Sequence, residues 1–295
     1  MSSRIDSRGA SVRWKLQIRR WTAFRLLALI AAGLSIGGQA ALAAPELASP
    51  WASGPGGRVR LVAAATSHNG TPVLLAVEFD LKPGWHTYWR VPGDSGIAPK
   101  FDWAGSRNLA RAEMRWPMPR RFDEMGEASY GYTGHVLLPV LARPEAAGAP
   151  LRLALALDYG VCSNICVASR AVLALDLPAD GALVPSSAAP AIGAALMRVP
   201  QPPANPGDLV MEKTMLDGRP ALSVRYRMPA QAAGMPVIIA VSDGDIYFDA
   251  PQGVREGGKV RYLLPVPDGG ALEGRKVTVL LSGEDVAIEA ERTIR

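Results

Sequence analysis

The sequence predicts an all-β protein made of two successive antiparallel β-sandwiches, the first of immunoglobulin-like size and the second smaller. Two observations support this prediction. Apolar side chains alternate with polar or small ones over 151–159 and again over 173–177, which is the period of a strand with one buried face. Further strand-like runs follow at 221–226, 237–241, 246–248, 260–264 and 277–281, separated by Gly, Pro and Asp turns. Short strands at this spacing are typical of a sandwich.

The first 43 residues resemble a secretory signal peptide. Seven basic residues precede an apolar run over 26–36, and Ala41, Leu42 and Ala43 form a small-x-small cleavage site before Ala44. An uncleaved anchor is the alternative, but the apolar run is shorter than the roughly 20 residues that span a bilayer. Cleavage removes the seven basic residues and one acidic residue, so the formal charge falls from +5 to −1. Without a basic patch after Ala44, a role in binding nucleic acid is not expected.

Composition divides the exported chain into two parts. All five tryptophans beyond the signal peptide, and both cysteines, lie before residue 170. Residues 179–206 are rich in Pro, Ala and Ser, with one helical candidate at 188–198, and are predicted to form a linker with a short helix. We therefore expect a signal peptide over 1–43, a first sandwich over 44–178, the linker over 179–206 and a second sandwich over 207–295.

Cys162 and Cys166 lie at the tip of a predicted β-hairpin. If the three residues between them form the loop, every cross-strand pair has residue numbers that sum to 328. In that register leucines meet leucines on one face, and the charged pairs on the other face are Arg152 with Asp176 and Asp158 with Arg170. The two cysteines then lie directly opposite, with Cα atoms roughly 4.5 to 5.5 Å apart, which is within the range of a disulfide.

The spacing of the cysteines leaves two roles open. A disulfide in an exported domain is often a structural bond, and an oxidising compartment keeps a dithiol reduced only if electrons are supplied. A disulfide stabilises the folded state by lowering the entropy of the unfolded chain. For a loop of about five residues this stabilisation is only about 2 kcal/mol, against about 4.7 kcal/mol for a loop near 100 residues. Spacing alone therefore allows either a redox pair or a structural bond.

Four motifs in a fixed order carry a resemblance to a known family. They are Pro83-Gly84-Trp85-His86-Thr87-Tyr88-Trp89-Arg90-Val91-Pro92-Gly93-Asp94-Ser95-Gly96, Phe122-Asp123-Glu124-Met125-Gly126, Leu138-Pro139-Val140, and Asp158-Tyr159-Gly160-Val161-Cys162 followed by Cys166. The chain resembles the N-terminal periplasmic domain of the DsbD family of thiol:disulfide interchange proteins, particularly its ScsB-like branch. The resemblance covers about residues 48–178 and extends more loosely through the second domain.

The resemblance implies a function and a set of site residues. It implies an immunoglobulin-like periplasmic domain, without a cofactor, that takes electrons from a membrane-embedded thiol transporter and passes them to oxidised periplasmic thioredoxin-like proteins. It gives Cys166 the mixed disulfide with the partner and Cys162 the second thiol. Tyr88 corresponds to a tyrosine beside the pair. A cap loop covers the pair in the family, and here it would contain Asp123 and Glu124, as candidate bases, and Met125 and Gly126.

Three departures from the family accompany the resemblance. The better-known members have five residues between the cysteines, whereas this chain has three. Met125 stands where those members have an aromatic cap residue, and a methionine is a softer shield. The sequence lacks the transporter helices and the C-terminal thioredoxin domain, so the membrane partner is expected on a separate chain.

A copper-binding or copper-tolerance protein is the main alternative function. A dithiol together with Met114, Met118 and Met125 offers the soft ligands that Cu(I) prefers. A carbohydrate-binding sandwich that uses the tryptophans is a third possibility, although one large aromatic per strand is ordinary sandwich core. The three histidines, His68, His86 and His135, show no metal-ligand spacing.

Overall fold

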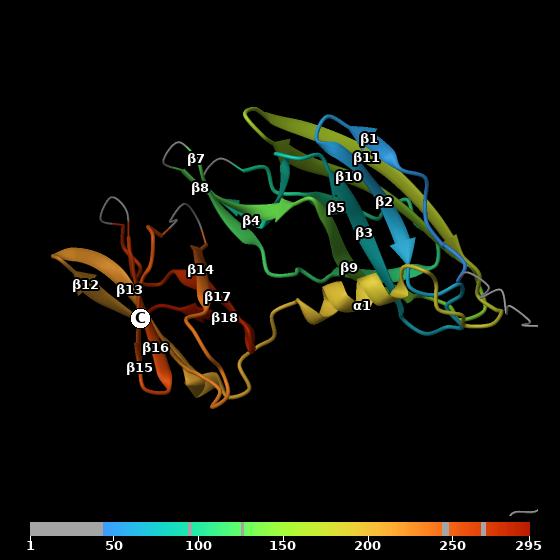
Figure 1. Cartoon of the computed structure of the whole chain (residues 1–295). Helices are drawn as coiled ribbons and strands as arrows, with labels where there is room; N and C mark the ends of the chain where they lie inside the picture. The colour runs from blue at the N-terminus through green and yellow to red at the C-terminus, as the bar shows by residue number, and fades with distance from the viewer. Residues whose placement is uncertain (1–43, 94–95, 125–126, 244–247, 267–269) are drawn as a thin grey trace, which may run out of the picture. The chain divides into compact units, whose positions relative to one another are not determined.

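The structure is a computed structural model that describes residues 44–93, 96–124, 127–243, 248–266 and 270–295. The predicted signal peptide, and Met125 and Gly126 of the predicted cap loop, lie outside the described residues. Nearly all of the regular secondary structure in the described chain is β-strand, which confirms the all-β prediction (Figure 1). Its one α-helix among these residues, α1 (Ala189–Met197), lies within the range predicted from the sequence.

Two antiparallel sheets contain the strands of the N-terminal half. The first has the order β1-β2-β3-β9-β6, and the second has the order β11-β10-β4-β8-β7, with β5 paired to β10 beside this path. The strands of the first sheet are β1 (Ala52–Gly54), β2 (Gly57–Ala63), β3 (Val73–Leu81), β6 (Leu109–Met114) and β9 (His135–Pro144). Those of the second are β4 (His86–Gly93), β5 (Lys100–Asp102), β7 (Arg120–Glu124), β8 (Glu127–Thr133), β10 (Leu151–Cys162) and β11 (Cys166–Leu177).

Alternating side chains build the core of this half. On β10, Leu151, Leu153, Leu155 and Leu157 are buried because every second residue of a strand points to the same face. Most of the tryptophans join this core: Trp89 is fully buried, and Trp85, Trp103 and Trp116 pack against it. Trp51 differs, because the guanidinium groups of Arg58 and Arg60 each lie 4.4 Å from its ring. The aromatic residues are therefore used mainly in packing.

Two further antiparallel sheets contain the strands of the C-terminal half, and they enclose a second hydrophobic core. One has the order β12-β13-β16-β15 and the other β14-β17-β18. The strands are β12 (Leu209–Leu216), β13 (Arg219–Arg227), β14 (Val237–Ser242), β15 (Gln252–Glu256), β16 (Lys259–Pro265), β17 (Lys276–Gly283) and β18 (Val286–Thr293). The domain boundaries expected at 178 and 206 remain a prediction.

The sequence predicted four of these seven strands. The runs at 221–226, 237–241, 260–264 and 277–281 fall in β13, β14, β16 and β17. The run at 246–248 lies partly outside the described residues, and Phe248 is a buried residue outside any strand. β15 was not predicted. All five of its residues are exposed, so its sequence has no alternation of apolar and polar residues that would indicate a strand. β12 and β18 were also missed.

Candidate functional site

The hairpin of β10 and β11 has the register predicted from the sequence. Its twelve cross-strand pairs run from Leu151 opposite Leu177 to Cys162 opposite Cys166, and all of them sum to 328. Of the two predicted charge pairs, Arg152 lies opposite Asp176 in the register, and Asp158 and Arg170 form an ion pair, with an Arg170 nitrogen 3.7 Å from an Asp158 carboxylate oxygen. Because both side chains are more than half exposed, this pair contributes little to stability. The value of such pairs is that they specify one register over its neighbours.

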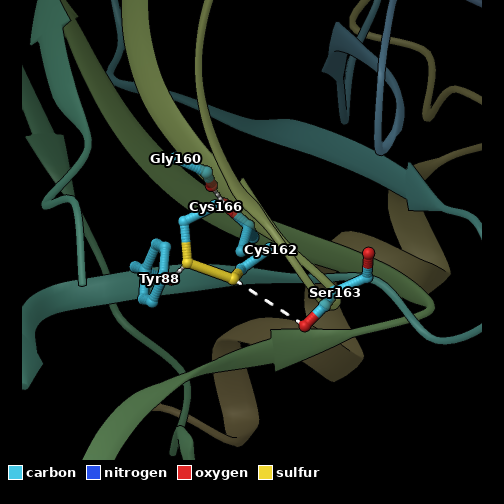
Figure 2. The surroundings of a disulfide bond; sticks show 6 residues. Tyr88, Gly160, Cys162, Ser163 and Cys166 are labelled. Carbon is cyan, nitrogen blue, oxygen red and sulfur yellow. Dashed lines mark hydrogen bonds between the residues drawn. A yellow bond between two sulfur atoms is a disulfide. The ribbon is translucent and has the colours of Figure 1, made fainter. Parts of the chain in front are cut away.

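A disulfide joins Cys162 and Cys166 at the tip of this hairpin (Figure 2). The two Cα atoms are 4.1 Å apart, close to the spacing of a non-hydrogen-bonded pair of antiparallel residues. The two cysteines differ in accessibility: Cys162 is only 2% exposed, whereas Cys166 belongs to the exposed residues at the tip. An external thiol therefore meets Cys166 first.

Tyr88, on β4, contacts the exposed cysteine directly. Its hydroxyl oxygen lies 3.1 Å from the Cys166 sulfur. A disulfide sulfur has no proton, so the tyrosine O–H donates and the sulfur accepts. On the other side of the bond, the Cys162 sulfur lies 3.9 Å from the carbonyl oxygen of Ser163, as Figure 2 shows. The Tyr88 side chain itself is 2% exposed, so the core fixes the position of this donor.

Two glycines make room for the Tyr88 ring. A Cβ atom added at Gly160 would lie 2.9 Å from a ring carbon of Tyr88, and one added at Gly96 would lie 2.7 Å from another. Any side chain at either position would therefore displace the ring and its hydroxyl. Both glycines lie in motifs that carry the family resemblance, but neither of them was predicted to have a role in the site. A glycine inside a strand is the signal that would have found Gly160, because it often marks a close approach.

His86 is a second buried side chain beside the disulfide, and it was not among the residues predicted for the site. It is the β4 residue directly opposite Cys162 on β10, and it is 3% exposed. Its ring stacks on Phe122 of β7, with centroids 4.5 Å apart and planes inclined by 16°. It also meets the Tyr88 ring edge-to-face at 5.2 Å. The rings of Phe122, His86 and Tyr88 therefore form a chain of contacts from β7, through β4, to the disulfide.

The two acidic residues of the predicted cap, Asp123 and Glu124, lie at the end of β7. Asp123 is exposed on β7 and forms an ion pair with Arg121 at 2.8 Å. Burial lowers the pKa of Arg121, but its hydrogen bond with Asp123 and the nearby Tyr130 raise the pKa overall. Glu124 pairs with Glu127 through the backbone at the end of β7. The roles of both acids as bases remain predictions.

The remaining histidines and methionines have structural contacts. His68 is fully buried, with Nε2 2.9 Å from the Ala149 carbonyl oxygen, and His135 contacts the Glu78 carboxylate at 2.6 Å. Met114 and Met118 pack against the core of the first half. Among the described residues, no group of three or more His, Cys, Asp or Glu side chains is arranged to hold a metal. In the same residues, no helix is both long and apolar enough to cross a membrane.

Comparison with known proteins agrees with this geometry. Residues 58–178 match the model of the family described as thiol:disulfide interchange protein DsbD, N-terminal. A solved structure, the N-terminal periplasmic domain of ScsB from Proteus mirabilis, matches with a TM-score of 0.67 and 23% sequence identity, over 84% of this chain and 98% of that chain. A chimeric titin Z1Z2 carrying a KLER peptide from decorin covers 85% of this chain and 98% of its own at 13% identity, with a TM-score of only 0.17. No curated protein matches the chain.

The fold and the site together define an immunoglobulin-like β-sandwich with a disulfide at an exposed hairpin tip. Residues 58–178 match the family model of the N-terminal domain of DsbD, the family that the motifs of the sequence resemble. The similarity to the ScsB domain confirms the predicted fold class.

Proposed function

We propose that this protein performs thiol:disulfide interchange in the periplasm, through Cys162 and Cys166. It takes electrons from a membrane-embedded thiol transporter on a separate chain and passes them to oxidised thioredoxin-like proteins. The observation that carries the proposal is the asymmetry of the disulfide, with Cys166 exposed at the hairpin tip and Cys162 buried beneath it. The family match of residues 58–178 supports the same chemistry.

The reaction begins with the reduced protein. The Cys166 thiolate attacks one sulfur of the partner's disulfide, and the other partner sulfur leaves as a thiolate that takes up a proton. The Cys162 thiolate then attacks Cys166 in the mixed disulfide, which forms the internal disulfide and releases the second partner thiolate. The partner gains two electrons and two protons, and this protein loses both. A dithiol of the membrane transporter restores them by the same exchange in reverse.

The surroundings of Cys166 suit this role. The exchange needs a thiolate, and hydrogen bonds to an anion are stronger than those to a neutral group. The Tyr88 hydroxyl, 3.1 Å from the Cys166 sulfur, is in position to donate such a bond when the disulfide is reduced. Asp123 and Glu124 are proposed to accept the thiol proton, and Met125 and Gly126 to cover the pair until a partner arrives, as the family resemblance implies.

A purely structural bond fits the geometry less well. The disulfide closes a loop of about five residues, which limits its entropic effect to about 2 kcal/mol. The hairpin beneath it already has twelve cross-strand pairs and buries one leucine-rich face. The bond therefore adds little to a strand pair that is fixed without it.

Trapping of mixed disulfides tests the proposal. The Cys162→Ser variant keeps the exposed sulfur but lacks the thiol that resolves the mixed disulfide, so it should accumulate adducts with periplasmic proteins. The Cys166→Ser variant is the matched control and should accumulate few. The reverse pattern would exchange the roles of the two cysteines, and adducts with neither variant would contradict interchange.

A redox titration of the unaltered protein complements the trapping. Thiol labelling in glutathione buffers should show one two-electron transition above about −300 mV, where the pair is reducible by a periplasmic donor. A pair that stays oxidised below that potential would be a structural bond.

A further inference from the structure

The outer strand β11 has an open hydrogen-bonding edge. β11 is the last strand of its sheet and is paired on one side with β10, without a register shift over twelve residues (Figure 1). It contains no proline and no bulge, and its buried face has no charged side chain. Prolines, bulges and inward-pointing charges are the usual features that keep an edge strand from pairing with another chain. A long edge that lacks them is suited to pair with a further strand.

The register identifies the free backbone groups. The tip pair, with Cα atoms 4.1 Å apart, has the spacing of a non-hydrogen-bonded pair, so the odd-numbered residues of β11 bond to β10. The even-numbered residues Ala168, Arg170, Val172, Ala174 and Asp176 direct their N–H and C=O groups to the open edge. Within the described chain, no other backbone hydrogen bond uses them. All five are exposed, and Val172 is 73% exposed.

We propose that this edge pairs with the same edge of a second copy of the chain, as two antiparallel β11 strands related by a two-fold axis. Identical edges that pair with each other form a closed dimer and leave no open end between the copies. The proposal concerns the assembly of the protein and does not rest on its proposed redox function.

Charge selects one register for this pairing. When Leu173 lies on the two-fold axis, Arg170 faces Asp176 of the second copy, and the same pair occurs again on the other side of the axis. Within each copy Arg170 is already opposite Asp158, and Asp176 is opposite Arg152. The face shared by the two copies then has a row of alternating charge, Asp158, Arg170, Asp176 of the second copy and Arg152 of the second copy. Opposite charges in directly facing positions stabilise a strand pair, and like charges destabilise it.

The same register accounts for the apolar residues of the strand. Val172, which is exposed in the single chain, faces Ala174 of the second copy, and two Leu173 side chains meet where the two cores join. Cys166 lies seven residues from Leu173, a distance of about 23 Å along a strand. The two disulfides would therefore lie at opposite ends of the strand pair, and both would remain accessible.

Charge reversal in the full-length chain tests the dimer. Sedimentation equilibrium of the unaltered protein should show a monomer–dimer equilibrium. Arg170→Glu or Asp176→Lys alone places like charges at both facing pairs and should raise the dissociation constant of the dimer at least about tenfold. An equimolar mixture of the two variants restores both pairs in the heterodimer, so it should associate more tightly than either variant alone. Arg111→Glu, on β6, is the matched control and should change nothing.

Cross-linking tests the register. In a background of Cys162→Ser with Cys166→Ser, a mixture of Val172→Cys and Ala174→Cys chains should form disulfide-linked heterodimers faster than either chain forms homodimers, because these residues face each other. A protein that stays monomeric up to about 1 mM, where even weak association shows, would overturn the proposal. A mixture of the charge variants that associates no better than its components would overturn it equally.

Discussion

Tyr88 is a buried residue whose hydroxyl group lies beside the sulfur of the exposed Cys166. The phenol is held by packing, with Gly160 and Gly96 against its ring, and its hydroxyl donates to the Cys166 sulfur. Because a buried donor does not have to be reordered when the thiolate forms, its hydrogen bond favours the anion without a further entropic cost.

Replacing this tyrosine should therefore slow the exchange. We expect Tyr88→Phe to keep the fold, because the ring remains, and to reduce the rate at which Cys166 of the reduced Cys162→Ser protein reacts with iodoacetamide by roughly tenfold at neutral pH, the loss of about one hydrogen bond to a charged group. The rate at high pH, where the thiol is ionised in both proteins, should be nearly equal. Equal rates at neutral pH would show that the hydroxyl has no part in activating the thiol.

The hairpin of β7 and β8 is the element that connects the disulfide to its predicted cap. Phe122 on β7 stacks on His86, and His86 lies beside Cys162 on the neighbouring strand. In the sequence, the predicted cap residues Met125 and Gly126 come between β7 and β8, and they lie outside the described residues. The stack is therefore in position to hold the hairpin against the site.

Loss of the stack should expose the disulfide. We expect Phe122→Ala to increase the rate of reduction by a small thiol such as dithiothreitol several-fold, because a stacked aromatic pair contributes about 1 kcal/mol. Arg120→Ala, an exposed residue on the same strand, is the control and should leave the rate unchanged. Met125→Gly should act in the same direction as Phe122→Ala. If neither variant reacts faster, this hairpin does not shield the pair.

Buried phenols make the whole molecule sensitive to alkali. Burial raises the pKa of Tyr132 well above its ordinary value and raises that of Tyr159 as well. Burial also raises the pKa of Tyr262 to about 12, and its hydroxyl donates to the carbonyl oxygen of Pro236. The folded protein thus keeps protons that the unfolded chain loses near pH 10, so the unfolding free energy falls as the pH rises above that value.

Removing one phenol should reduce this sensitivity. We expect Tyr262→Phe to lower the unfolding free energy at pH 8 by about 1 kcal/mol, through the lost hydrogen bond, and to lose less stability than the unaltered protein between about pH 9 and pH 11. Urea denaturation at several pH values measures both effects. An identical pH dependence in the two proteins would mean that Tyr262 ionises as easily in the folded state as in the unfolded chain.

The sequence by itself determined the hairpin that bears the disulfide and four of the seven strands around the second core. Its register follows from side-chain period and from two charge pairs, and these are properties of neighbouring residues that any reader of the sequence can check. Its motifs also indicated the family whose model residues 58–178 match. Strands without an apolar alternation, such as β15, were beyond this reasoning.

Only the tertiary structure decided what surrounds the sulfurs. Tyr88 reaches Cys166 from 78 residues away, and Phe122 reaches His86 from another strand of the sheet. The fit of Gly160 and Gly96 to one ring, and the burial of Cys162 beside an exposed Cys166, depend on how β4, β7 and β10 lie together. Periodicity states which face of a strand is buried, but it contains no information on which distant side chain packs there, because that is set by the packing of whole strands.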